Sequence, residues 1–155
     1  MEAIVPFDET ESVQVFIENE AESSIKNTYD EKTLAFIKSD TVSSPYPFPY
    51  GFVVGTLSGD GDCVDCFVVT DQGLKSGSLV ECKPIHLLEQ VEDGEVDHKV
   101  LAVPADKSGE IGDPEVEAIR GFIRTVFAHV PGKTMELGAL HAADKAREYI
   151  RRCTT

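Results

Sequence analysis

Short apolar runs separated by glycine, proline and acidic turns fill the first two thirds of the chain, and helical patterns follow only after Pro104. Loose alternation of apolar and polar residues within such runs predicts strands, because successive side chains of a strand point to opposite faces. The predicted strands are Val13–Glu18, Leu34–Lys38, Phe52–Leu57, Val64–Thr70, Ser78–Leu88 and His98–Val103. Strands followed by helices favour an α+β protein, mainly β, with a small antiparallel barrel and helices packed outside it.

Prolines and acidic residues set the breaks between these runs. Three prolines between Ser43 and Gly51 exclude helix there and favour a rigid, extended segment that holds two tyrosines. Pro84 is expected to bend the strand around it. Residues Glu92–Glu95 predict an acidic turn before the last strand.

Two helices are predicted in the last third. Asp113 followed by Pro114 indicates a helix start, with the aspartate as the cap and proline at the first helical position. Apolar residues then recur at helical spacing until a Pro-Gly pair ends the pattern. A second helix is predicted from about Thr134 to Arg152, with basic residues near the negative end of its dipole.

Length and composition favour one domain over residues 1–155, since this size and 41% hydrophobic content support a sizeable core. No apolar run is long enough to span a bilayer, and the acidic stretch Met1–Glu11 does not resemble a signal peptide. We therefore expect a cytoplasmic protein with no membrane partner. The net charge of −14 argues against nucleic acid, whose binding depends on neutralised phosphates. An anionic substrate would need bound cations to reverse the local field.

Three aspartates, Asp60, Asp62 and Asp65, crowd into six residues. Carboxylates this close repel one another, and a divalent cation between them relieves the repulsion. Asp65 also enters an apolar run, where a carboxylate is costly unless it coordinates something. An EF-hand is excluded, because Val64 replaces its fifth-position ligand and Asp71 stands where it needs glutamate. The remaining alternative to a metal site is a solvated, aspartate-rich turn.

A second acidic group follows later in the chain. Glu92 and Asp97 flank the acidic turn, and Lys99 lies two residues beyond Asp97, on the same face of a strand. If this group meets the first cluster, the carboxylates suit two or more Mg²⁺ ions, with Mn²⁺ as the alternative. Paired metals ionise a bound water and clamp a phosphoryl group, and Lys99 could hold a phosphate oxygen.

Four cysteines are expected to be reduced. Cys63 and Cys66 form a CxxC pair, but positions three apart on a strand point to opposite faces. Small core residues are therefore favoured over a zinc or redox pair.

Three motifs occur in order: Tyr46-Pro47-Phe48-Pro49-Tyr50-Gly51, then Asp60-Gly61-Asp62-Cys63-Val64-Asp65, then Asp97-His98-Lys99 before a Val103-Pro104 strand end. Together they resemble soluble family I inorganic pyrophosphatases, whose signature is Asp-x-Asp-x-x-Asp shortly after Tyr-Pro-x-x-Tyr-Gly. The resemblance is strongest between Tyr46 and Pro104. It implies a five-stranded, OB-like barrel with C-terminal helices, Mg²⁺-dependent hydrolysis of pyrophosphate and, commonly, a homo-oligomer.

The resemblance also implies roles for residues. Metal ligands would be Asp60, Asp65, Asp97, Glu92 and Glu18, where Glu92 replaces the family's usual aspartate. Asp62 would act as general base on the nucleophilic water. Tyr50 and Lys99 would contact phosphate during catalysis, and Lys26 and Tyr46 would complete the phosphate site.

The sequence departs from the family pattern at several positions, and two of these departures thin the cationic contacts to phosphate. Thr28 stands in place of an early glutamate, and only Lys38 could replace an arginine, without its bidentate fork. Val126 and Phe127 occupy the position of a Tyr-Lys pair, for which Lys133 could compensate. We predict weakened or altered pyrophosphatase activity. One alternative is a regulatory protein that kept the metal site and lost efficient catalysis. Another is hydrolysis of a different phosphoanhydride, such as a nucleotide.

Overall fold

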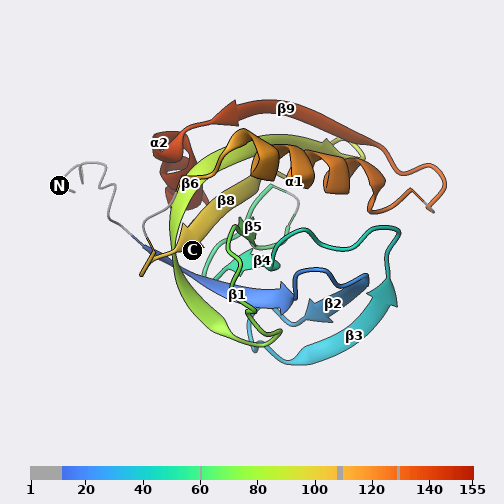
Figure 1. Ribbon diagram of the computed structural model, residues 1–155, viewed down its shortest axis with the longest axis horizontal. Helices are drawn as coiled ribbons and strands as arrows, with labels where there is room; N and C mark the ends of the chain where they lie inside the picture. Colours follow the sequence, from blue (N-terminus) through green and yellow to red (C-terminus); the bar gives the residue numbers. More distant parts are fainter. Residues whose placement is uncertain (1–11, 60, 108–109, 129) are drawn as a thin grey trace.

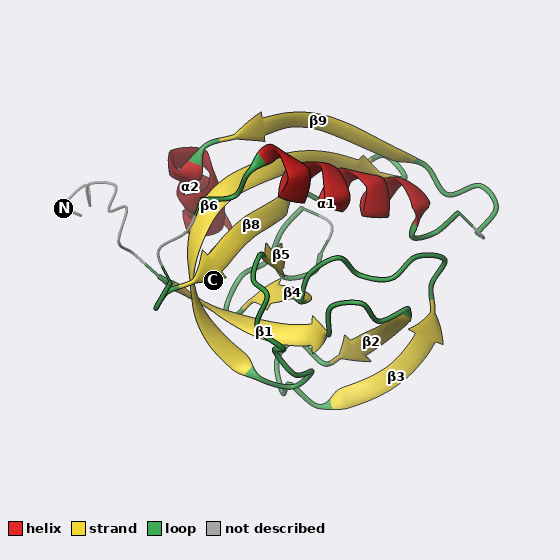
Figure 2. Ribbon diagram, viewed as in Figure 1, coloured by secondary structure: helices red, strands yellow, loops and turns green. Residues whose placement is uncertain are grey.

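A computed structural model of the chain describes residues 12–59, 61–107, 110–128 and 130–155. More of the described residues lie in strands than in helices (Figures 1 and 2). The strands are β1 (Val13–Asn19), β2 (Ile25–Tyr29), β3 (Phe36–Thr41), β4 (Tyr50–Val53), β5 (Asp65–Val68), β6 (Leu79–Glu92), β7 (Glu95–Val96), β8 (Lys99–Pro104) and β9 (Met135–His141). The helices are α1 (Asp113–Thr125) and α2 (Ala143–Cys153). Within these described residues, no helix is long and apolar enough to cross a membrane.

Five strands close into a barrel in the order β1-β4-β5-β8-β6, with β6 returning to pair with β1. This arrangement confirms the predicted mainly-β fold class and the five-stranded, OB-like barrel. One pairing departs from the antiparallel expectation, because β5 and β8 run parallel. The long strand β6 carries the chain back across the barrel between them, so that β8 starts at the same end as β5. A register shift between Pro84 and His86 bends β6, as the proline suggested.

Gly51 allows β1 and β4 to approach closely. A Cβ atom added at this position would lie 1.7 Å from the carbonyl oxygen of Phe16. Only glycine fits such a contact, which explains why this residue ends the proline-rich segment at the barrel wall.

The region after Pro131 differs from the prediction. The predicted helix from Thr134 is wrong over its first part, where residues 135–141 form β9 and pair antiparallel with β6. Hydrogen bonds to the free edge of β6 override the weak helical pattern there. The helix begins only at Ala143, and its side chains Ala146, Tyr149 and Ile150 are buried. At α1 the N-cap is Gly112, one residue before the predicted Asp113.

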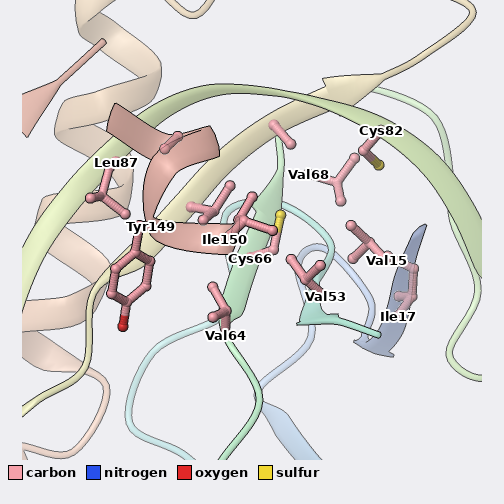
Figure 3. Packing of buried hydrophobic residues seen from close by; sticks show 13 residues of the cluster. Val15, Ile17, Val53, Val64, Cys66, Val68, Cys82, Leu87, Tyr149 and Ile150 are labelled. Carbon is pink, nitrogen blue, oxygen red and sulfur yellow. The ribbon is translucent and has the colours of Figure 1, made fainter. Parts of the chain in front are cut away.

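The core has two main layers, because successive side chains of each strand point alternately to the inside and to the outside of the barrel. Inward side chains of the barrel, among them Val15, Cys66 and Val100, pack against Tyr149 and Ile150 of α2 (Figure 3). Outward side chains such as Phe67 and Leu101 pack against α1. The β2–β3 hairpin is set apart from the barrel strands in Figure 2, on the side where β1 ends.

Candidate active site

A cavity of about 430 Å³ lies outside the barrel wall, between the strands, the end of α1 and the β2–β3 hairpin. Strand alternation directs side chains into it: because Ile17, Cys66 and Val100 face inward, their neighbours Glu18, Asp65 and Lys99 face outward. All the predicted site residues that the structure describes line this one cavity: Glu18, Lys26, Tyr46, Tyr50, Asp62, Asp65, Glu92, Asp97 and Lys99. Asp60, the remaining predicted ligand, lies outside the described residues.

Lys99 joins the two acidic groups that are far apart in sequence. Its ammonium nitrogen lies 2.6 Å from Asp65 Oδ2 and 3.0 Å from Asp97 Oδ2. The parallel register of β5 and β8 places Asp65 directly beside Lys99, and Asp97 follows two residues away. Burial lowers the pKa of Lys99, but the two carboxylates outweigh it and raise the pKa above its usual value. The lysine is therefore charged and holds both carboxylates.

Asp97 and Glu92 form the second part of this acidic group. Burial, followed by the nearby Asp65, raises the pKa of Asp97 to about 9 despite the opposing charge of Lys99. Burial also disfavours the charged form of Glu92, but hydrogen bonds from Lys133 and Asp97 outweigh it, and the pKa of Glu92 is lowered. Lys133 Nζ lies 2.7 Å from Glu92 Oε1. The region holds more carboxyl groups than its own cations neutralise.

Glu18 and Lys26 face the cavity from β1 and β2. Burial, then the charge of Asp65, raises the pKa of Glu18 to about 8, while Lys26 acts in the opposite direction. The Lys26 ammonium lies over the ring of Phe127, 5.3 Å from its centroid. This part of the site therefore adds one more carboxyl group and one cation.

The proline-rich segment supplies two tyrosines. Tyr46 is buried, and its ring centroid lies 5.4 Å from that of Tyr50 and 4.5 Å from that of Phe122 on α1. The Tyr50 ring packs at a tilt against Phe67, with centroids 4.7 Å apart, and the Lys99 ammonium lies 5.7 Å from the centroid of the Tyr50 ring. Burial and the nearby carboxylates raise the pKa of the Tyr50 hydroxyl, which therefore stays protonated and can donate a hydrogen bond.

The turn before β5 brings Asp62 to the rim of the cavity. Gly61 adopts a φ of 88°, and Asp62 is exposed. Opposite it lies Glu31, whose carboxylate accepts a hydrogen bond of 3.1 Å from the Cys63 backbone N–H. Burial raises the pKa of Glu31. Sequence reasoning missed this residue, because no motif surrounds it and only the contact with the aspartate loop identifies it.

The wall formed by the end of α1 and the loop before β9 carries fewer charges. Val126 and Phe127 line the cavity where the resemblance expects a Tyr-Lys pair, and Lys133 lies beside them. Lys38, the suggested substitute for arginine, is exposed on β3, pairs with Asp40 at 3.5 Å and does not line the cavity. Thr28 lines the cavity without adding charge.

The donor set fits hard divalent cations. Oxygen ligands from carboxylates are those that Mg²⁺ prefers. The raised pKa values of Asp97 and Glu18 show that their ionised forms are disfavoured in the metal-free protein, and a bound cation would stabilise those forms. Within the described part of the chain, no three His, Cys, Asp or Glu side chains are grouped to hold an ion as they stand. The ammonium groups of Lys99 and Lys133 instead contact three of these carboxylates.

Comparisons with known proteins identify the family of this chain. The family model for inorganic pyrophosphatase matches residues 15–155. An inorganic pyrophosphatase of Aeropyrum pernix is 36% identical, covering 96% of this chain and 92% of the relative. One from Saccharolobus solfataricus is 35% identical, with coverage of 92% and 90%.

Solved structures are similar in fold. An inorganic pyrophosphatase structure from Neisseria gonorrhoeae has a TM-score of 0.84 at 27% identity and covers 92% of this chain and 88% of that one. One from Thermus thermophilus has the same TM-score of 0.84 and 27% identity, with coverage of 97% and 94%. The family model spans nearly all of the described residues, and the two relatives are 36% and 35% identical to this chain. The chain therefore belongs to the inorganic pyrophosphatase family.

Proposed function

We propose that this chain hydrolyses inorganic pyrophosphate to two phosphates in a reaction that requires a divalent cation. The observation that carries the proposal is the convergence of Asp62, Asp65, Glu92, Asp97 and Lys99, from three separate segments, on one cavity. Family membership supports the same reaction, since the relatives are inorganic pyrophosphatases.

The ligands of the cations would be Asp65, Asp97, Glu92 and Glu18, together with Asp60. Two or more Mg²⁺ ions suit this number of carboxylates, and Mn²⁺ is the alternative. Bound divalent ions would neutralise the carboxylates and lower the pKa of a coordinated water. They would also reverse the negative local field, so that a doubly phosphorylated anion could enter a protein of net charge −14.

The protein's own groups would orient the reactants. Asp62, exposed at the rim, would take the proton of the attacking water as general base. Lys99, Lys26 and the protonated hydroxyl of Tyr50 would donate to phosphate oxygens. Tyr46 would support Tyr50 through their ring contact.

The remaining parts of the proposal concern the whole protein. Residues 1–155 would act as one domain, in the cytoplasm, as a homo-oligomer. Pyrophosphate would be the partner molecule, and neither nucleic acid nor a membrane would bind.

A second candidate is a regulatory protein that binds metal and phosphate without efficient turnover. The apolar pair Val126 and Phe127 favours it, as does Lys38, whose side chain pairs with Asp40 outside the cavity. Each missing cationic contact would remove about 3–4 kcal/mol of transition-state stabilisation if nothing compensated.

A phosphate-release assay tests the proposal. The purified protein is supplied with pyrophosphate and Mg²⁺, beside samples with EDTA, with Mn²⁺, and with a panel of nucleoside triphosphates. The proposal expects Mg²⁺-dependent release from pyrophosphate in preference to the nucleotides. Tight calorimetric binding of methylenediphosphonate without release from pyrophosphate would favour the regulatory candidate. Faster phosphate release from a nucleotide than from pyrophosphate would show that the nucleotide is the substrate.

A further inference from the structure

Phe127 contacts two lysines that come from distant parts of the chain. The ammonium nitrogen of Lys133, from the loop before β9, lies over the ring at 4.5 Å from its centroid. That of Lys26, from β2, lies over the ring at 5.3 Å. Both distances fall within the range in which an aromatic ring attracts a cation. One ring thus contacts two positive charges, and both lysines line the cavity.

The second partner of Lys133 is Glu92. Their atoms lie 2.7 Å apart, and Asp93 lies at 3.9 Å. Glu92 ends β6 in the acidic group that suits a divalent ion. A divalent ion bound there would compete with Lys133 for this carboxylate, and the lysine would then be available to another anion in the same cavity.

Two alternative roles for these side chains fit the geometry less well. As a stabilising ion pair, Lys133–Glu92 would contribute little, because both side chains are about a quarter exposed, at 26% and 22%. As a stacking platform for an organic group of the substrate, Phe127 would need an accessible ring, but the two ammonium groups already lie over it.

We infer that Lys133, held by the ring of Phe127 beside Lys26, is a further contact for the second phosphate group of the substrate. Lys133 replaces the cation that is missing at position 127, and Phe127 is a positioning residue that acts through both lysines. Glu92 pairs with Lys133 in the metal-free protein and exchanges this lysine for a divalent ion. This inference rests on the proposed function, since it assigns the substrate contacts of the same cavity.

Calorimetry with methylenediphosphonate, a non-hydrolysable diphosphate, in the presence of Mg²⁺ measures the predicted contact without turnover. Lys133→Gln should bind it about 10- to 100-fold more weakly than the unmodified protein, because a charge-assisted hydrogen bond is lost. Lys133→Arg keeps the charge and should retain affinity within about fivefold. Lys145→Gln is the matched control, because Lys145 is exposed on α2 and pairs only with Glu148 at 3.6 Å among the ion pairs of the described residues.

Phe127→Leu tests the positioning role while keeping an apolar side chain of similar size. It should weaken diphosphate binding about three- to tenfold, since both cation–π contacts are lost. In steady-state assays it should raise KM more than it lowers kcat. A purely structural ring would change neither. If Lys133→Gln does not fold, as judged by circular dichroism, Phe127→Leu and Lys133→Arg decide the question.

A titration with Mg²⁺ alone separates phosphate binding from an indirect effect on the metal. Lys133→Gln should bind Mg²⁺ at least as tightly as the unmodified protein, because it removes a competitor for Glu92. Weaker Mg²⁺ binding by this variant would overturn the inference and reduce Lys133 to a support for Glu92. Diphosphate affinity equal to that of the Lys145→Gln control would also overturn it. Absent turnover in the unmodified protein would refute the proposed function alone, because the calorimetric comparison requires none.

Discussion

The strand wall of the cavity, which carries Asp65, Asp97 and Lys99, is held by backbone pairing, whereas the helix wall, which carries Phe127 and Lys133, is held by side-chain contacts. Asp65 and Lys99 are register partners on neighbouring strands, and Lys99 is largely buried while Asp65 is partly buried. Phe127 lies two residues beyond the end of α1, and Lys133 lies in a loop.

This difference shows which half of the site tolerates substitution. A one-residue change of register in the strand wall would turn its carboxylates into the barrel core, so the motif there is strongly constrained. On the helix wall, a cation can reach the same space from the helix end, from the loop or from the hairpin. The resemblance to the family is accordingly strong along the strands and weak around residues 126–127. Substitutions in the two walls should therefore differ in the size of their effects.

The largest effect is expected at the general base. Asp62→Asn should lower kcat by about 100- to 10,000-fold, because the amide cannot accept the proton of the attacking water. Since Asp62 is exposed at the rim, the free energy of unfolding should change by less than about 1 kcal/mol. Phosphate release and urea unfolding measure the two quantities. Full kcat in Asp62→Asn would show that another residue acts as the general base.

Removing the buried cation of the strand wall should destabilise the metal-free protein. Lys99→Met leaves Asp65 and Asp97 without their shared partner in a buried position and should lower the free energy of unfolding by about 3–5 kcal/mol. Added Mg²⁺ should raise the free energy of unfolding of Lys99→Met by more than it raises that of the control Lys145→Met. Equal stability of the two variants in EDTA would show that the strand wall does not depend on Lys99.

A smaller effect is expected at Tyr50. Tyr50→Phe keeps the ring contact with Phe67 and removes only the hydroxyl, so stability should change little. The loss of a hydrogen bond to phosphate should lower kcat/KM about tenfold. Unchanged kcat/KM, measured by phosphate release at low pyrophosphate concentration, would show that the Tyr50 hydroxyl does not contact the phosphate.

The smallest effect is expected at Lys38. Its pair with Asp40 is exposed and lies outside the cavity, so Lys38→Ala should change the free energy of unfolding by less than about 0.5 kcal/mol. The affinity for methylenediphosphonate should also stay the same. A tenfold loss of this affinity would show that the β2–β3 hairpin folds over the substrate and that Lys38 contacts it.

The strand wall could be predicted from sequence because its information is local. Alternation within β5 and β8 fixes the direction of Asp65 and Lys99, and the spacing of Asp97 and Lys99 puts them on one face. The closing order of the barrel strands and the parallel pairing of β5 with β8 required the structure, since no short segment specifies a distant partner.

The features that sequence reasoning missed depend on contacts between segments that are far apart. Residues 135–141 have a weak helical pattern, but the edge of β6 selects a strand. Glu31 enters the site through a hydrogen bond to Cys63, and Phe127 is important for two lysines that are distant in sequence. None of these relationships has a signature in the order of residues.

Phosphate release from pyrophosphate by the unmodified protein and by Asp97→Asn, each with and without Mg²⁺, tests most directly whether the converging carboxylates bind the ions that drive hydrolysis. Release should require Mg²⁺ in the unmodified protein and fall by about 100-fold or more in the variant. Equal rates for the two proteins, or release that persists in EDTA, would contradict the account.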